Sequence, residues 1–278
     1  MEEPPEYGQC RPAPVLRRSV SRYTGYRITG PPGLHHGLPS GHLTLIVCLS
    51  GTLDVVAMPD RARPPVSSVS MVAGLHDAPA VISHDGRQYG VQLDLTWQGA
   101  RTLFGVPAGE LVGDVVDLAA LLGRRAGELA DRLAGAAGWR QRFDVLDHVL
   151  AGLADDRRAE PPAEVTRAWR RLAATGGRLP VGELARELGW SRRHLGERFR
   201  REVGLSPKTA ARVIRFERAC RRMRSAARPP LAEVAAECGY FDQAHLAREF
   251  RALAGTTATG WLAEFPSVQD QGGGPAPG

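Results

Sequence analysis

The sequence has little that would build a disulfide framework, a zinc site or a membrane span. Its four cysteines, Cys10, Cys48, Cys220 and Cys238, show no CxxC spacing and no paired histidine pattern. Unpaired thiols in a reducing compartment are therefore the default interpretation. The longest apolar run, 43–49, is far shorter than the ~20 residues that cross a bilayer. The acidic N-terminus lacks the apolar core of a signal peptide, so we expect a cytoplasmic protein without a membrane contact.

Signatures of catalysis are missing as well. The chain contains no GxSxG motif and no phosphate-binding loop. Asp77 and Asp94 have no partner carboxylate at a spacing that suggests acid–base chemistry. We therefore predict no catalytic residues and no cofactor.

Lysine is almost absent, since Lys208 is the only one and every other basic residue is arginine. With abundant Ala, Gly and Pro, this bias is typical of a GC-rich genome, so the number of arginines is weak support for phosphate binding. Their position is more informative. Residues 180–265 contain 16 Arg or Lys against 10 Asp or Glu, whereas the rest of the chain has 20 of each. The whole net charge of +6 lies in this segment, which favours an anionic partner there.

At 278 residues the chain is long enough for two domains. Residues 1–20 are rich in Pro and Arg and are expected to be poorly ordered. From residue 21 the pattern is mostly β. Strands are predicted at 43–49 and 53–57, joined by a hairpin loop at 50–52, and at 80–84 and 89–95, joined by a hairpin turn at Asp85-Gly86. Short strands joined by turn residues indicate a small β sandwich or barrel.

After residue 96 the pattern becomes helical. Helices are predicted at 97–104, within 115–133 and at 139–154. We expect the helices of 115–154 to support dimerisation, so that 21–154 forms a β-rich sensing or oligomerisation domain with a helical C-terminal part. The polar run 155–162 ends in two prolines and is the expected linker. The Gly- and Pro-rich end, 266–278, is expected to be a disordered tail.

An internal repeat dominates residues 163–265. Val181–Val203 aligns with Leu231–Leu253 when one extra residue is allowed in the second turn. The shared positions are the apolar ones and the turn glycines, such as Gly189 and Gly239. Each copy has a short helix, a glycine turn and a second helix, which is the pattern of a helix-turn-helix. Glycine suits the left-handed residue that ends the first helix.

A long helix is predicted between the two copies, from Pro207 to about Arg224, with proline at the favoured first position. At ~1.5 Å per residue this helix spans about 25–27 Å. It can hold two recognition helices about one DNA turn, ~34 Å, apart. The repeat therefore predicts a protein that binds double-stranded DNA through two helix-turn-helix units.

Two stretches of the repeat, LARELGWSRRHLGERFRREVGLSP and EVAAECGYFDQAHLAREFRALAGTT, support a family assignment. On these residues the region 163–265 resembles the DNA-binding domain of the AraC/XylS family of bacterial transcription regulators. The resemblance implies seven helices, with two helix-turn-helix units joined by a long helix. It also implies an N-terminal sensing domain, often a cupin-like β barrel. The expected fold is therefore α+β with two domains: a small cupin-like β barrel or sandwich plus helices, then an all-α domain.

The resemblance also assigns roles to residues on the two recognition helices, which begin near Ser191 and Asp242. The expected base-reading residues, on the groove-facing sides, are Arg192, Arg193, Glu197, Gln243 and Arg248. Arginine can read guanine, glutamine can read adenine, and glutamate can accept from cytosine, each contact giving ~1–3 kcal/mol of discrimination. The expected phosphate-binding residues are Arg200, Arg201, Arg212 and Arg215.

Some positions depart from the family pattern or have a structural interpretation. Gly196 offers no side chain to the groove, so the first unit is expected to read fewer bases. Thr257-Ala258 stands where the family commonly has Ser/Thr-Pro, so the last helix is expected to start less sharply. Trp190 and Tyr240, just after the turn glycines, are interpreted as packing residues. His194 and His245 are interpreted as having a structural or phosphate-adjacent role.

Two alternative functions remain open at this level. One is a cupin-like enzyme or metal-binding domain tethered to the DNA-binding module, suggested by His35, His36, His42, His76 and His84. A metal bound at His35, His42 and His84 would favour it, but the HxH motif and downstream Glu of metal-binding cupins are absent, and we predict no metal. The other is a nonspecific architectural DNA binder, which two distinct recognition helices argue against.

The preferred hypothesis is a sequence-specific transcription regulator. Its C-terminal domain binds operator or promoter DNA, and its N-terminal domain responds to an unidentified small-molecule effector or to oligomerisation. A homodimer is expected, and RNA polymerase is a candidate partner.

Overall fold

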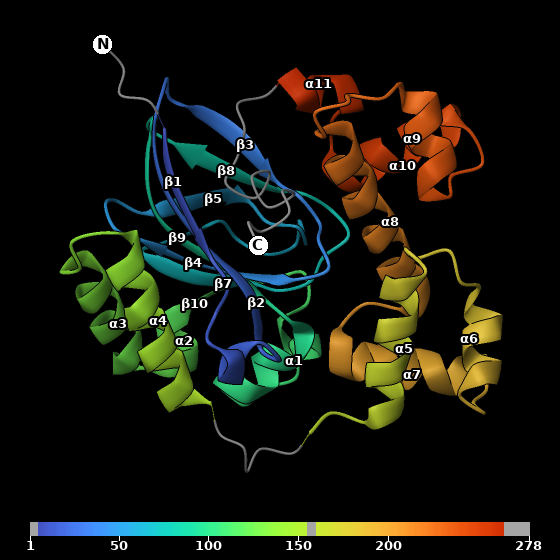
Figure 1. The fold of residues 1–278 in the computed structure, drawn as a ribbon, viewed down its shortest axis with the longest axis horizontal. Coiled ribbons are helices and arrows are strands. Elements are labelled where there is room, and N and C mark those ends of the chain that lie inside the picture. The colour runs from blue at the N-terminus through green and yellow to red at the C-terminus, as the bar shows by residue number, and fades with distance from the viewer. Residues whose placement is uncertain (1–4, 155–159, 264–278) are drawn as a thin grey trace.

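The computed structural model describes residues 5–154 and 160–263. Its N-terminal part contains two β-sheets with helices on one side, and its C-terminal part is helical (Figure 1). The predicted two-domain α+β architecture is confirmed. Most of the expected linker, 155–159, and the expected tail, 266–278, lie outside the described residues. Within the described ranges, every helix is too short or too polar to traverse a lipid bilayer.

Within the described part of the chain, ten strands make up the two sheets. Their bounds are β1 Glu6–Cys10, β2 Val20–Thr29, β3 Gly33–Gly37, β4 Leu43–Cys48, β5 Leu53–Ala57, β6 Val66–Ser68, β7 Ser70–Ala73, β8 Ala80–His84, β9 Arg87–Leu95 and β10 Val115–Asp117. The larger sheet has the order β1-β2-β9-β4-β7-β10, and the smaller has the order β3-β8-β5-β6. Neighbouring strands are antiparallel in both sheets.

Both predicted hairpins are wrong in their pairing. β4 pairs with β7 and β9 in the larger sheet, whereas β5 pairs with β6 and β8 in the smaller one. The turn at Asp85-Gly86 leads in the same way from β8 to β9, which lie in different sheets. Gly86 does have the expected left-handed backbone, with φ +96°. Turn residues reverse the chain direction, but they do not select the partner strand.

The N-terminal segment 1–20 contains more order than expected. β1 pairs with β2 from Glu6–Arg27 to Cys10–Tyr23, and Leu16 is fully buried. The Ala13 N–H donates to the Asp147 carboxylate at 2.9 Å. The prediction of a poorly ordered segment is therefore wrong from Glu6 onward. Pro12 and Pro14 lie in the connection between β1 and β2, Pro14 in the 3₁₀ turn Pro14–Leu16, where no ladder hydrogen bond is required.

Helices cover one face of the larger sheet. They are α1 Trp97–Gly99 with the π-helical turn η2 Ala100–Phe104, the 3₁₀ turn η3 Ala108–Leu111, α2 Leu118–Leu122, α3 Arg124–Ala134 and α4 Trp139–Leu153. Alternate strand residues such as Leu45 and Leu93 are fully buried in the same core as Leu146 of α4. The period-2 alternation of a strand places Gln92 and Asp94 on the opposite face, toward the smaller sheet.

Seven helices form the C-terminal domain within 160–263. They are α5 Ala163–Ala174, α6 Val181–Glu187, α7 Arg192–Val203, α8 Pro207–Met223, α9 Leu231–Cys238, α10 Gln243–Ala254 and α11 Ala258–Ala263. The last helix does have a polar start, because the Gly260 N–H donates to Thr257 Oγ1 at 3.0 Å. Thr257 therefore caps this helix as Ser206 caps α8, although Ala258 replaces the proline of the family pattern.

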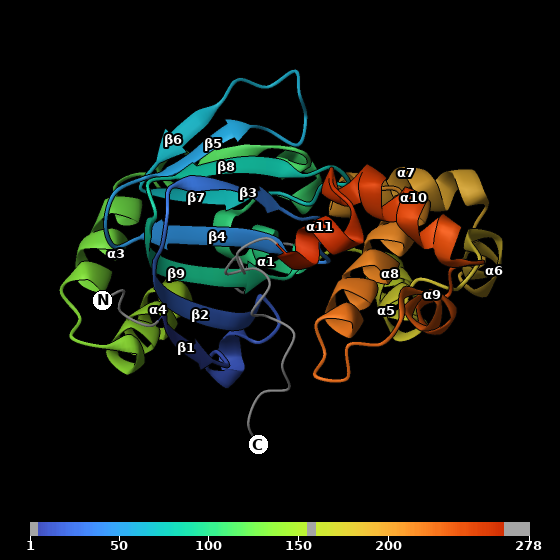
Figure 2. The same cartoon turned by 90° about the horizontal axis from the view of Figure 1, so that it is seen from above.

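The two domains lie side by side and are in direct contact (Figures 1 and 2). Arg101 of η2 donates to Glu202 of α7 at 2.7 Å. The backbone N–H of Gly41, which precedes β4, donates to Glu217 of α8 at 3.1 Å. Gly109 of η3 packs so closely on α7 that an added Cβ would lie 2.4 Å from the Arg201 carbonyl oxygen. The N-terminal domain therefore contacts both α7 and the connecting helix α8.

Candidate DNA interface

The two halves of the repeat have the same turn geometry. Gly189 and Gly239 lie in the left-handed region, with φ +69° and +80°. In each unit the next residue closes the turn by donating its N–H to a carbonyl of the first helix: Trp190 to Ala185 and Tyr240 to Ala235, both at 2.9 Å. Only a residue without a Cβ adopts this backbone without strain. The alignment of the two copies is therefore a structural equivalence.

The second helix of each unit is capped in the same way. The Ser191 side chain accepts from the His194 N–H at 3.1 Å, and the Asp242 side chain accepts from the His245 N–H at 2.6 Å. Each cap satisfies one of the free N–H groups in the first turn of its helix. The two caps start α7 and α10 at equivalent positions.

An aromatic ring packs on a histidine in both units. The Trp190 and His194 rings lie 4.6 Å apart and the Tyr240 and His245 rings 5.4 Å apart, each pair at an interplanar angle of 82°. These contacts fix the turn against the first turn of the recognition helix. They agree with the packing role expected for Trp190 and Tyr240 and with the structural alternative for His194 and His245.

The connecting helix α8 holds the two units apart. Its 17 residues correspond to about 25 Å at ~1.5 Å per residue. Ser206 caps its start by accepting from the Thr209 N–H at 3.0 Å. Phe216 packs against Phe250 of α10, with 5.1 Å between ring centroids. The side-chain cap fixes the start of α8, and the contact with Phe250 fixes its apolar face. The helix therefore sets the spacing of the two units.

The expected base-reading residues all lie on the surface. Arg192, Arg193 and Glu197 are exposed on the first turns of α7, and Gln243 and Arg248 are exposed on α10. Arg193 and Glu197 are paired with each other at 2.8 Å, so part of their hydrogen-bonding capacity is already used. At Gly196 an added Cβ would meet nothing closer than an Arg200 nitrogen at 3.5 Å. The side of α7 that carries Arg192, Arg193 and Glu197 therefore has no side chain at its centre.

The expected phosphate-binding residues fall into two groups. Arg200 and Arg201 are exposed at the end of α7. Arg212 and Arg215 are half-buried and bind Glu249 of α10 at 2.8 and 3.5 Å. Arg215 also donates to the Gly177 carbonyl at 3.0 Å and lies over the Tyr240 ring. This second pair thus joins α8 to α10, a role that the sequence does not reveal because Glu249 is far away along the chain.

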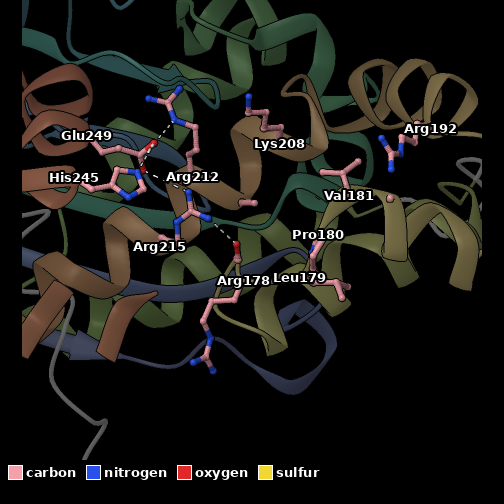
Figure 3. A pocket seen from close by; sticks show the side chains of 13 residues that line it. Arg178, Leu179, Pro180, Val181, Arg192, Lys208, Arg212, Arg215, His245 and Glu249 are labelled. Carbon is pink, nitrogen blue, oxygen red and sulfur yellow. Dashed lines mark hydrogen bonds and ion pairs between the residues drawn. The ribbon is translucent and has the colours of Figure 1, made fainter. Parts of the chain in front are cut away.

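A basic cavity of about 670 Å³ opens between the two units (Figure 3). Five basic side chains line it, together with the single carboxylate of Glu249; they are Arg178, Arg192, Lys208, Arg212 and Arg215. Sequence reasoning missed Arg178 and Lys208, which lie outside the two recognition helices and are both exposed. The position of Lys208 next to Pro207, at the start of α8, was the available signal. A concave surface lined by one sign of charge concentrates anions.

Two helix-turn-helix units on a rigid connector, with a basic surface between them, define a DNA-binding transcription regulator. Residues 184–264 match the family model described as a helix-turn-helix domain. The match covers most of the C-terminal domain and assigns it to the helix-turn-helix class. No curated protein matches the sequence.

Solved structures share the two-domain fold. An apo form of ToxT from Vibrio cholerae is 9% identical with a TM-score of 0.54, covering 86% of this chain and 96% of that one. Wild-type ToxT bound to an unsaturated fatty acid is 9% identical with a TM-score of 0.53, covering 94% and 96%. Because the sequences are only 9% identical, the likeness shows a shared two-domain fold and nothing further.

Proposed function

We propose that this regulator reads its operator through two unequal recognition helices and that its N-terminal domain controls how they are presented. The exposed side chains of Gln243 and Arg248 on α10 are the observation that carries the proposal. Glutamine and arginine pair bidentately with adenine and guanine in the major groove. On α7, Arg192, Arg193 and Glu197 supply the remaining base contacts around the open position of Gly196.

The phosphate contacts come from the ends of α7 and from the basic cavity. Arg200 and Arg201 lie at one edge, and Arg178 and Lys208 add exposed positive charge between the units. Arg212 and Arg215 contribute to the field of the cavity while they hold Glu249. Phosphate contacts of this kind set the register on the duplex and carry no sequence information.

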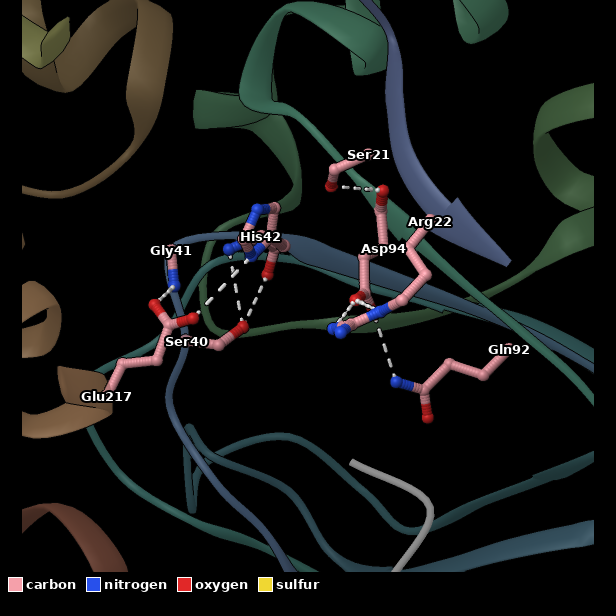
Figure 4. Close-up of polar contacts among 8 residues, drawn as sticks. All are labelled: Ser21, Arg22, Ser40, Gly41, His42, Gln92, Asp94 and Glu217. Carbon is pink, nitrogen blue, oxygen red and sulfur yellow. Dashed lines mark hydrogen bonds and ion pairs between the residues drawn. The ribbon is translucent and has the colours of Figure 1, made fainter. Parts of the chain in front are cut away.

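Control by the N-terminal domain follows from where it contacts the repeat. The glycine after each recognition helix packs against it: an added Cβ on Gly204 would lie 2.8 Å from Val112, and one on Gly255 would lie 3.0 Å from Pro79. The Gly41 loop binds Glu217 in the middle of α8 (Figure 4). A shift of this domain would therefore change the relative position of α7 and α10.

A small-molecule effector has a candidate location on the polar face of the larger sheet. Arg22 and Gln92 both donate to the Asp94 carboxylate, Gln92 at 3.1 Å (Figure 4). Gln92 is only 5% exposed, and its Oε1 atom has no hydrogen-bond partner. A buried acceptor without a donor is costly, so a ligand hydroxyl or amide would be favoured there. The structurally similar ToxT binds an unsaturated fatty acid, which supports control by a small-molecule effector.

Two partners belong to the same proposal. The helices of 115–154 provide an outer surface on which two copies can form a homodimer, and RNA polymerase is the partner expected of an activator. Light scattering at micromolar concentration would report the dimer, and a monomer there would contradict it. Among the described residues, no group of three His, Cys, Asp or Glu side chains is placed to hold a metal ion.

The test is the loss of specificity in Arg248→Ala. We expect this variant to weaken binding to a selected operator about 5–150-fold, corresponding to ~1–3 kcal/mol, and to relax one operator position. Binding to random DNA should change little. Arg87→Ala at the start of β9 is the control, because it removes an exposed arginine that lies outside both the repeat and the helices of 115–154. An equal loss on operator and random DNA would show that Arg248 does not read a base.

A further inference from the structure

Phe241 is an exposed aromatic residue in a part of the molecule that otherwise buries its rings. It is 93% exposed, more than any other large hydrophobic residue in 5–154 and 160–263. Its neighbour Tyr240 is 5% exposed, and Phe250 on the following helix is fully buried. An apolar ring in water gains none of the ~25 cal/mol per Å² that burial provides. Burial of the Phe241 side chain therefore does not stabilise the fold.

The fold does not require a residue at this position. In the first unit Gly189, Trp190 and the cap Ser191 are consecutive. In the second unit Phe241 stands between Tyr240 and the cap Asp242, and it is the one extra residue of the repeat. Both turns nevertheless close with the same hydrogen bond and both recognition helices have the same cap. The first unit shows that this turn forms without the insertion.

The backbone of Phe241 is held in place although its side chain is exposed. Its N–H donates to His245 Nδ1 at 3.2 Å, and the His245 ring packs on Tyr240. The side chain thus projects from a fixed point at the N-terminal end of α10, two residues before Gln243. In helix-turn-helix proteins the N-terminal residues of the recognition helix contact the base edges. Phe241 directly precedes the cap of α10, beside the residues that would make such contacts.

We propose that Phe241 is a base-contacting residue that packs on the 5-methyl group of a thymine in the half-site read by α10. Thymine presents the only apolar group in the major groove, and phenylalanine is among the side chains that contact it. The inference rests on the proposed base-reading role of α10. It gives the second unit a determinant for thymine beside the adenine and guanine determinants Gln243 and Arg248, and it explains why the insertion occurs in this unit.

The experiment uses the full-length protein and an operator selected by it from random double-stranded DNA. Each thymine of the half-site is replaced in turn by deoxyuridine, which lacks only the methyl group. Dissociation constants are then measured for the wild type and for Phe241→Ala. One replacement should weaken wild-type binding about fourfold. This factor corresponds to the ~0.8 kcal/mol that burial of one methylene-sized group contributes. The same replacement should have no effect on Phe241→Ala.

Two further variants test whether the contact depends on an apolar side chain. Phe241→Leu should keep the sensitivity to the methyl group, and Phe241→Ser should lose it. Because the side chain is exposed, both variants should keep the wild-type unfolding midpoint. The proposal is overturned if no thymine shows a methyl effect in the wild type, or if the effect is equal in Phe241→Ala. It is also overturned if Phe241→Ala loses affinity equally for operator and random DNA, which would indicate backbone contact.

Failure of the proposed function would look different. If the selection yields no preferred sequence at all, base reading by both helices is wrong and the inference falls with it. If Phe241→Ala binds the operator normally but loses activation of transcription, the ring contacts a protein partner instead of thymine.

Discussion

Single residues make the two recognition helices unequal. α10 presents Gln243 and Arg248 with the exposed ring of Phe241 beside them. α7 presents Arg193 and Glu197, which bind each other at 2.8 Å, around a glycine. An ion pair on a helix surface competes with base contacts for the same donors and acceptors. The helix with fewer internal contacts is therefore expected to contribute more to discrimination.

Replacing Gly196 with alanine should stabilise the protein. Glycine inside a helix costs ~1 kcal/mol relative to alanine, and the new methyl group would meet no atom closer than 3.5 Å. The free energy of unfolding should rise by about 0.5–1 kcal/mol, measured by urea denaturation. Gly109→Ala is the contrasting variant, since its Cβ would lie 2.4 Å from a backbone oxygen of α7 and should destabilise. A Gly196→Ala protein no more stable than the wild type would contradict the prediction.

His35 should make the stability of the protein depend on pH. Burial, with the neighbouring His84 and His36, lowers the pKa of His35 to about 4, against an ordinary value of ~6.5. Above pH ~6.5 the ring is neutral in both states and has no effect. Between pH ~6.5 and 4 only the unfolded chain binds the proton, so the free energy of unfolding falls by at most about 3 kcal/mol.

The comparison with His35→Gln isolates this effect, because glutamine does not titrate. Urea unfolding of both proteins at pH 7 and pH 5 should show a smaller acid-induced loss in the variant. Equal losses in the two proteins would remove His35 as the cause.

Between elements, the connection of α8 to α10 depends on Glu249. Its carboxylate binds Arg212 and Arg215 and lies 4.0 Å from His245. We expect Glu249→Gln to lower the free energy of unfolding by about 1–3 kcal/mol, because two half-buried guanidinium groups lose their charged acceptor. The same change removes the only carboxylate of the basic cavity, so binding to random DNA at low salt should become tighter.

Glu237→Gln is the matched control for this prediction. Glu237 also joins α8 to a neighbouring helix, through Arg222, but this ion pair lies at the surface. Surface pairs contribute little to stability, and Glu237 does not line the cavity. Tighter nonspecific binding in both variants would show that general charge, and not the cavity, is responsible.

At the scale of the whole molecule, the Arg101–Glu202 pair connects the two domains. Glu202 has a side-chain exposure of 8% and Arg101 of 23%. Arg101→Ala should cost about 2–4 kcal/mol because it leaves a buried carboxylate without its partner. The double variant Arg101→Met/Glu202→Met should recover part of that loss, since two apolar side chains can replace a buried pair. Tryptophan fluorescence during urea unfolding measures both, and a double variant no better than Arg101→Ala would contradict the assignment.

The DNA-binding domain was predictable because its determinants are local. A left-handed glycine, a capping residue and apolar residues at helical spacing act within a few positions of each other, and they occur twice. The positions of Arg192, Arg248 and the other proposed base-reading residues followed from the family resemblance of the two recognition helices. The insertion of Phe241 was also visible in the alignment, but its exposure was not.

The tertiary structure decided what depends on partners distant in the chain. β4 and β5 are joined by a good turn and still enter different sheets, where each pairs with a strand that is distant in sequence, β4 with β9 and β5 with β8. Arg215 was expected to contact a phosphate, but in the fold its guanidinium group binds the Glu249 carboxylate and the Gly177 carbonyl. The sequence alone determined that two helix-turn-helix units are joined by a long helix. Only the fold determined which arginines remain available to DNA and where the N-terminal domain contacts the two units, because both depend on packing between segments that are far apart in sequence.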